Sequence, residues 1–208
     1  MCNSGVGLTP IVDGQIHHFS AGGLYNGLIL LIDDETRTYW DHISGEALHG
    51  PLSGTSLPMW GIEQSTVGAL RKTEPQLRLH LNRTTWWTRL VTWLTARWHG
   101  KLPPGFRFTM DRSDDRLGEM EIGLGLADGA GKFFPINLLP KLASDQLDQA
   151  HVENWQGKAM RIYIDASSSI PRAEYVDGTM PPQLFSRWYG YSRTYPNCEI
   201  MDDASSSP

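Results

Sequence analysis

Cys2, His42 and His49 have side chains of the types that commonly bind transition metals. A thiolate and two imidazoles are good ligands for Zn or Cu. The two histidines are seven positions apart with a glycine turn between them, so a hairpin would bring their imidazoles together. Asp41 and Glu46 lie beside them and would orient an imidazole as hydrogen-bond acceptors. The sequence therefore predicts a metal-binding or redox site in the N-terminal half, with Cys2, Asp41 and Glu46 as candidate catalytic groups.

Cys2 also supports an alternative chemistry. Removal of Met1 would make Cys2 the N-terminal residue, whose own α-amine acts as a general base in N-terminal-nucleophile amidases. Amidases of this kind normally carry a Gly-Arg-Asn-x-Asp-like stretch soon after the cysteine, and no such stretch follows Cys2. An N-terminal-nucleophile amidase that uses Cys2 is therefore the alternative hypothesis to the metal site.

The segment from Thr85 to Trp98 differs from the rest of the chain. Its pattern predicts a helix with four tryptophans, two leucines and a valine on one face, and threonine and arginine on the other. Such a helix covers a core, lies in a membrane interface or binds a protein partner. The alternative function is therefore a non-catalytic binding or scaffold module attached to a membrane surface or a partner.

The sequence around these residues consists mainly of short apolar or alternating segments separated by turns, a pattern that indicates short strands. It predicts a mainly β (α+β) fold of short antiparallel strands with a few short helices. His17 and His18 are expected on opposite faces of one strand. The predicted strands cover residues 16–19, 27–32, 38–40, 47–48, 57–60, 121–127, 132–135 and 159–165. Short helices are predicted at residues 137–142 and 185–193.

Two blocks of sequence recur in the same order, which predicts two related halves. The first block contains Val-Asp-Gly at residues 12–14 and 176–178, and the second contains Thr-x-Pro at residues 73–75 and 194–196. Residues 1–82 form the first half, residues 83–104 the inserted helix, residues 105–201 a structural second copy, and residues 202–208 a disordered tail. In the second half a strand precedes the first block, so the matching strand of the first half is expected upstream of Met1.

The net charge and the hydropathy of the chain argue against some classes of function. The chain of 208 residues has a net charge of −5, which argues against general nucleic-acid binding. It contains no apolar run long enough to cross a membrane and no signal-peptide pattern after Met1. A cytoplasmic location follows by default, and a periplasmic or membrane-associated one if translation starts upstream of Met1.

Four motifs follow one another in the N-terminal half: Cys2-Asn3-Ser4, a Ser-Gly turn at residues 20–23, Asp-x-x-Thr at residues 33–36, and Trp40, Gly45, Ala47 and Gly50 in the spacing Trp-x-x-x-x-Gly-x-Ala-x-x-Gly. In these motifs the chain resembles the bacterial domain of unknown function 3179 family, and the resemblance covers most of the chain except the Trp-rich helix. A second unit, with Lys132 and Pro135 in register, is similar to the family's later Lys-x-x-Pro unit. The resemblance implies an additional cysteine upstream of Cys2 in a Cys-x-x-Cys segment, so a site needing both thiols would be incomplete here. It implies no particular function.

Overall fold

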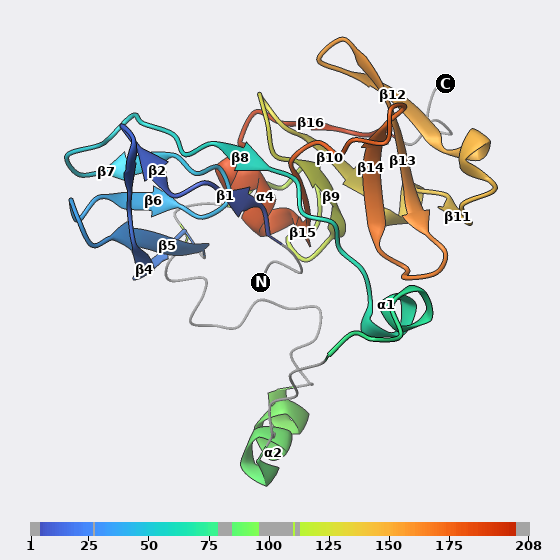
Figure 1. Cartoon of the computed structure of the whole chain (residues 1–208), viewed down its shortest axis with the longest axis horizontal. Coiled ribbons are helices and arrows are strands. Elements are labelled where there is room, and N and C mark those ends of the chain that lie inside the picture. Colours follow the sequence, from blue (N-terminus) through green and yellow to red (C-terminus); the bar gives the residue numbers. More distant parts are fainter. Residues whose placement is uncertain (1–4, 27, 79–84, 96–109, 111–112, 203–208) are drawn as a thin grey trace.

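The computed structural model describes residues 5–26, 28–78, 85–95, 110 and 113–202. Within these residues the chain consists mostly of short strands in several sheets, with few helices (Figure 1). The predicted mainly β fold is confirmed. Two strand pairs are parallel rather than antiparallel: β10 (Lys132–Pro135) with β16 (Glu199–Ile200), and β11 (Lys141–Leu142) with β13 (Lys158–Asp165).

The N-terminal half is built around a four-stranded antiparallel meander. Its strands follow in chain order: β4 (Phe19–Tyr25), β5 (Leu28–Asp33), β6 (Tyr39–Asp41) and β7 (Ala47–His49). Two small pairs flank it, β2 (Ile11–Val12) with β3 (Gln15–Ile16), and β1 (Gly7–Leu8) with β8 (Met59–Trp60). The fully buried Trp40 is the centre of the core here, packed with Val12, Ala47 and Leu57.

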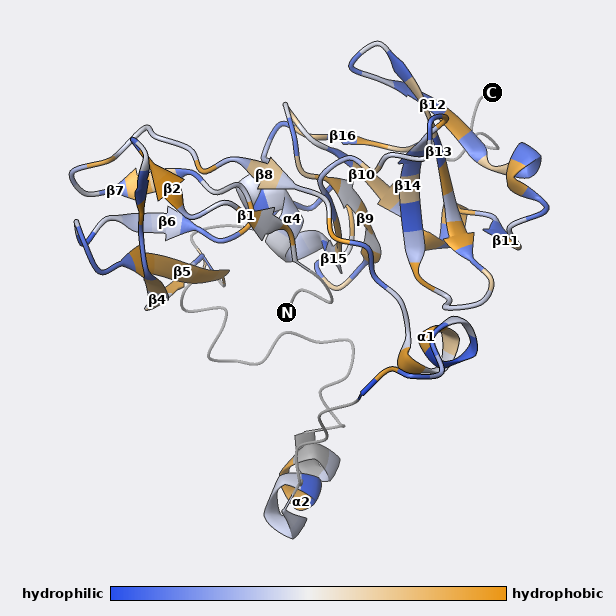
Figure 2. Cartoon of the chain, in the orientation of Figure 1, coloured by the Kyte–Doolittle hydropathy of each residue, from blue (hydrophilic) through white to orange (hydrophobic). Residues whose placement is uncertain are grey.

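The C-terminal half contains two further sheets. One has the order β15 (Gln183–Arg187), β9 (Ile122–Leu126), β10, β16, and the other has β11, β13 and β12 (His151–Trp155), with β14 (Pro171–Tyr175) also paired to β13. Apolar residues of both sheets form one core cluster, including Leu124, Phe134, Met160 and Ile162. Strand β5 is largely orange in Figure 2.

Helix α4 (Trp188–Thr194) packs closely on β9. A Cβ atom at Gly125 of β9 would come within 2.1 Å of the Tyr191 ring, so only glycine allows this approach. The Tyr191 hydroxyl donates to the carbonyl of Leu126 at 2.5 Å. The core around α4 also includes Leu28 and Ile43 of the N-terminal half, so it joins the two halves of the chain.

Several predicted elements have different boundaries. His17 and His18 lie between β3 and β4, not on one strand, because the chain turns there: the His17 amide donates to the carbonyl of Pro10. Residues 185–193 begin as strand β15, and the helix starts only at Trp188. Residues 137–142 form a short 3₁₀ turn, η2 (Ile136–Leu138), and then strand β11.

The two Thr-x-Pro segments have closely similar backbones. Helix α1 (Val67–Thr73) ends at Glu74 with φ −124° and ψ 73°, and α4 ends at Tyr195 with φ −122° and ψ 71°. Each of these residues donates its amide to the carbonyl four positions earlier. The Val-Asp-Gly turns are less alike, since Asp13 has φ 49° and the Asp177 side chain accepts from Thr179. The duplication of the halves stays a prediction.

Candidate functional site

The predicted metal ligands do not converge among the described residues. Cys2 lies outside those residues. His49 is paired with Tyr39 in the β6–β7 hairpin, whereas His42 follows the other end of β6. Three strand positions separate Tyr39 from His42, or about 10 Å of chain. The expectation that the hairpin brings the two imidazoles together is therefore wrong, because its register places them at opposite ends.

The remaining predicted site residues take other positions. His42 is partly buried, and its Nδ1 has no hydrogen-bond partner within the described part of the chain. Asp41 accepts from the amides of Ile43 and Ser44 at 2.6 and 3.1 Å, so its carboxylate closes the turn after β6. Asp41 and Glu46 line one pocket of about 260 Å³ at the junction with α4.

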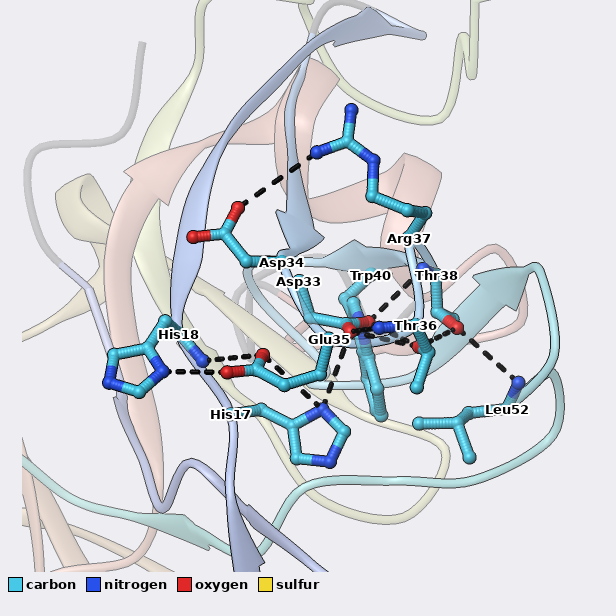
Figure 3. Close-up of polar contacts among 10 residues, drawn as sticks. All are labelled: His17, His18, Asp33, Asp34, Glu35, Thr36, Arg37, Thr38, Trp40 and Leu52. Carbon is cyan, nitrogen blue, oxygen red and sulfur yellow. Dashed lines mark hydrogen bonds and ion pairs between the residues drawn. The ribbon is translucent and has the colours of Figure 1, made fainter.

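A polar cluster lies instead at the turn between β5 and β6 (Figure 3). Its centre is Asp33, the last residue of β5, which is completely buried. Four donor groups hold its carboxylate at 2.6–3.1 Å: the Thr36 amide and hydroxyl, the Thr38 amide and the Trp40 indole. Burial by itself raises the pKa of Asp33, but these hydrogen bonds and one from His17 outweigh it and lower the pKa to about 2.

Two histidines and a glutamate complete the cluster. His17 Nδ1 lies 3.4 Å from Asp33 Oδ1 and 3.9 Å from Glu35 Oε2. His18 Nδ1 lies 2.6 Å from the other Glu35 oxygen, and the His18 amide also donates to Glu35. Hydrogen bonding with Glu35 raises the pKa of His18, and the same contact lowers the pKa of Glu35. His17 is buried, whereas His18 is largely exposed.

Sequence reasoning did not select this cluster. The predicted continuous strand directs His17 and His18 to opposite faces, so it does not bring both to one site. The available signal was an aspartate ending an apolar strand with threonine three positions later, a pattern typical of a side chain that closes a turn. Nothing in the local sequence indicates that residues 17 and 18 lie against this turn.

A second candidate site is the surface of helix α2 (Trp86–Thr95). The predicted helix is present over this range, and residues 96–98 of the predicted segment lie outside the described part. Five large apolar side chains of α2 are between 37% and 66% exposed: Trp86, Trp87, Leu90, Val91 and Trp93. The helix lies apart from the sheets in Figure 1. None of the helices that the structure describes is long and apolar enough to cross a membrane.

Comparison with known families gives one match. The model of a family described as "Protein of unknown function (DUF3179)" matches residues 1–172. The chain belongs to the DUF3179 family. The match includes the Asp33 cluster and α2, and it ends within β14, before β15 and α4. Searches among curated proteins and among solved structures give no match to this chain.

Proposed function

We propose that this DUF3179 protein is a binding module that attaches to anionic membrane surfaces through α2 and the basic segment around it. The observation that carries the proposal is the exposed apolar surface of α2. Three of its five exposed large side chains are tryptophans, the residue type that favours the membrane–water interface. Soluble proteins seldom expose such a continuous apolar surface without a binding role.

The charge of the surrounding segment supports an anionic partner. Residues 64–110 contain eight of the chain's 18 Lys and Arg residues but only one of its 23 Asp and Glu residues. This segment has a net charge of +7, although the whole chain has −5. Each basic side chain near an anionic leaflet contributes about 1 kcal/mol of binding.

The two features complement each other physically. A ten-residue helix buries too little apolar area to hold a protein firmly on a bilayer, and stable attachment usually needs a second signal. The basic residues supply that second signal. Among the described residues, Arg71, Lys72, Arg78 and Arg89 lie on α1, on α2 or between them. The proposed location is therefore the surface of a membrane with acidic lipids.

Vesicle co-sedimentation tests the proposal. The wild-type chain is expected to bind vesicles containing phosphatidylserine, more weakly as salt increases, and to bind pure phosphatidylcholine vesicles poorly. The double variant Trp87→Ser/Trp93→Ser should bind at least tenfold more weakly. The matched control Ile16→Ser/Val152→Ser removes side chains of similar exposure, 63% and 65%, from the sheets and should bind as the wild type does.

Three results would contradict the proposal. They are no binding to acidic vesicles, equal losses in the test and control variants, and tighter binding to single-stranded nucleic acid than to vesicles. The predicted Zn or Cu site of Cys2, His42 and His49 and the predicted Cys2 amidase have no support among the described residues, and they stay predictions.

A further inference from the structure

We propose that His17, Asp33 and Glu35 form a binding site for a divalent transition metal, with Zn²⁺ as the expected occupant. One imidazole nitrogen and one oxygen from each carboxylate lie within 4.8 Å of one another. Imidazole and carboxylate together are common zinc ligands. This inference is independent of the membrane-binding proposal, since none of its residues lies on α1, on α2 or in the segment around them.

The distances between the ligand atoms are close to those that a zinc ion requires. Tetrahedral zinc with bonds of 2.0–2.2 Å requires its ligand atoms to be about 3.3–3.6 Å apart. The distance from His17 Nδ1 to Asp33 Oδ1 is 3.4 Å, and that to Glu35 Oε2 is 3.9 Å. A good N–H···O hydrogen bond is 2.7–3.2 Å long. The buried imidazole therefore sits too far from both carboxylates for a strong hydrogen bond and near the spacing of two metal ligands.

Asp33 has one contact, with His17, that is longer than its others and that a metal could replace. Its donors from Thr36, Thr38 and Trp40 all lie at 2.6–3.1 Å. The contact with His17 is longer than any of these. An ion between His17 and Oδ1 would leave the shorter hydrogen bonds in place, and these bonds would hold the carboxylate in position for the metal.

Burial and exposure also fit a metal that enters from solvent. His17 and Asp33 have side chains that are 5% and 0% exposed, whereas the Glu35 side chain is 34% exposed. Glu35 thus forms the open side of the cluster. His18 holds the other oxygen of Glu35 at 2.6 Å and acts as a positioning residue. Two carboxylates and a neutral imidazole balance the charge of a divalent ion, and water would complete its coordination.

Zinc titration of the purified chain tests the site, with affinity read from competition against a chromophoric chelator. The wild type is expected to bind one equivalent of Zn²⁺, and Glu35→Gln and His17→Gln should each weaken binding at least tenfold. Asp34→Asn is the matched control. It removes the same charge from the neighbouring residue, whose carboxylate lies beside Arg37, and should not change the affinity.

The variants also separate this site from the one that the sequence predicts. Cys2→Ser and His42→Ala should bind zinc as the wild type does. Co²⁺ in place of Zn²⁺ should give visible absorption without the strong charge-transfer band of a thiolate ligand. The proposal is overturned if the wild type binds no equivalent of zinc, if Glu35→Gln and His17→Gln bind normally, or if Cys2→Ser abolishes binding. Circular dichroism of His17→Gln, alongside the exposed Glu35→Gln, excludes misfolding as the cause.

Discussion

The turn at residues 33–38 and the turn at residues 165–170, one in each half, share the same backbone hydrogen bonds but have different surroundings. In both, an aspartate ends a strand, and the residue four positions later has a positive φ: 61° at Arg37 and 57° at Ser169. That residue donates its amide to the aspartate carbonyl at 3.1 and 2.7 Å. The aspartate amide in turn donates to the carbonyl five positions later in both turns.

Both aspartates also accept from a hydroxyl residue three positions later, Thr36 or Ser168. Burial raises the pKa of Asp165 as it does that of Asp33, and hydrogen bonds from Ser168 and Ser167 outweigh it and lower the pKa to about 2. An Asp-x-x-Ser/Thr turn therefore needs no histidine and no second carboxylate.

The two aspartates differ in their burial and in the residues outside the turn that contact them. Asp33 is fully buried and holds the indole of Trp40, the central residue of its core. Asp165 is only partly buried, and its donors come from the turn itself. His17 and Glu35 are additions to the first turn. The aspartate and its donors within the turn therefore build the turn, whereas His17 and Glu35 are not needed for it.

Replacing each aspartate by asparagine should give the largest difference between the turns. Asp33→Asn puts an NH₂ group where a carboxylate oxygen accepts from buried donors, so at least one buried donor loses its acceptor. We expect a loss of about 3 kcal/mol in the free energy of unfolding, against about 1 kcal/mol for Asp165→Asn, because Asp165 is only partly buried and its donor Ser167 is exposed to water. Urea unfolding followed by Trp fluorescence measures both, and equal losses would contradict the distinction.

Acid should remove the next largest amount of stability. The folded pKa of Asp33, about 2, is below its unfolded value of 3.8, so its contribution is complete above about pH 4 and is lost as pH falls towards 2. The expected loss is roughly 2 kcal/mol. Asp165 should contribute less, because solvent screens its partly exposed carboxylate.

Unfolding free energies of the wild type and Asp33→Asn between pH 5 and pH 2 test this prediction. The variant should depend less steeply on pH, since it lacks the titrating group. An identical slope would mean that Asp33 is protonated at similar pH in the folded and unfolded chains. Asp165→Asn provides the matching measurement for the second turn.

Local pattern predicted much of this fold. The strands predicted for the apolar run of β5, for the hairpin of β9 and β10 and for β13 end within one or two residues of the observed ends. Helix α2 was recognised from its periodic tryptophans. Each of these elements has its own apolar run or periodicity, so the information that specifies it lies in the local sequence.

The polar cluster could not be found in this way. Asp33 and His17 are 16 positions apart in the sequence. Their contact depends on the two residues that interrupt the strand between β3 and β4. Conversely, His42 and His49 are close in sequence, but strand register separates them. Metal ligands must lie close together in the folded chain. The types of the side chains and their spacing in the sequence do not determine those distances.

Loss of the turn hydroxyls should have a moderate effect. Thr36→Val keeps the shape of the side chain and removes the O–H donor to Asp33, and Ser168→Ala removes the corresponding donor to Asp165. We expect losses of about 1 kcal/mol for each in urea unfolding. The amide donors remain in both variants, so a loss as large as that of Asp33→Asn would show that the hydroxyl, not the set of donors, holds the carboxylate.

The smallest effect on stability is expected from Glu35→Ser, which gives the first turn the residue found at the same place, Ser167, in the second. Glu35 and His18 form an exposed pair, and such pairs contribute little to stability. The second turn is closed with serine at this position, whose hydroxyl donates to Asp165 at 2.7 Å. The urea midpoint of Glu35→Ser should therefore equal that of the wild type, while its affinity for zinc falls at least tenfold. Unchanged zinc affinity would mean that Glu35 is not a metal ligand. A large fall in stability would mean that the first turn, unlike the second, needs a glutamate at this position.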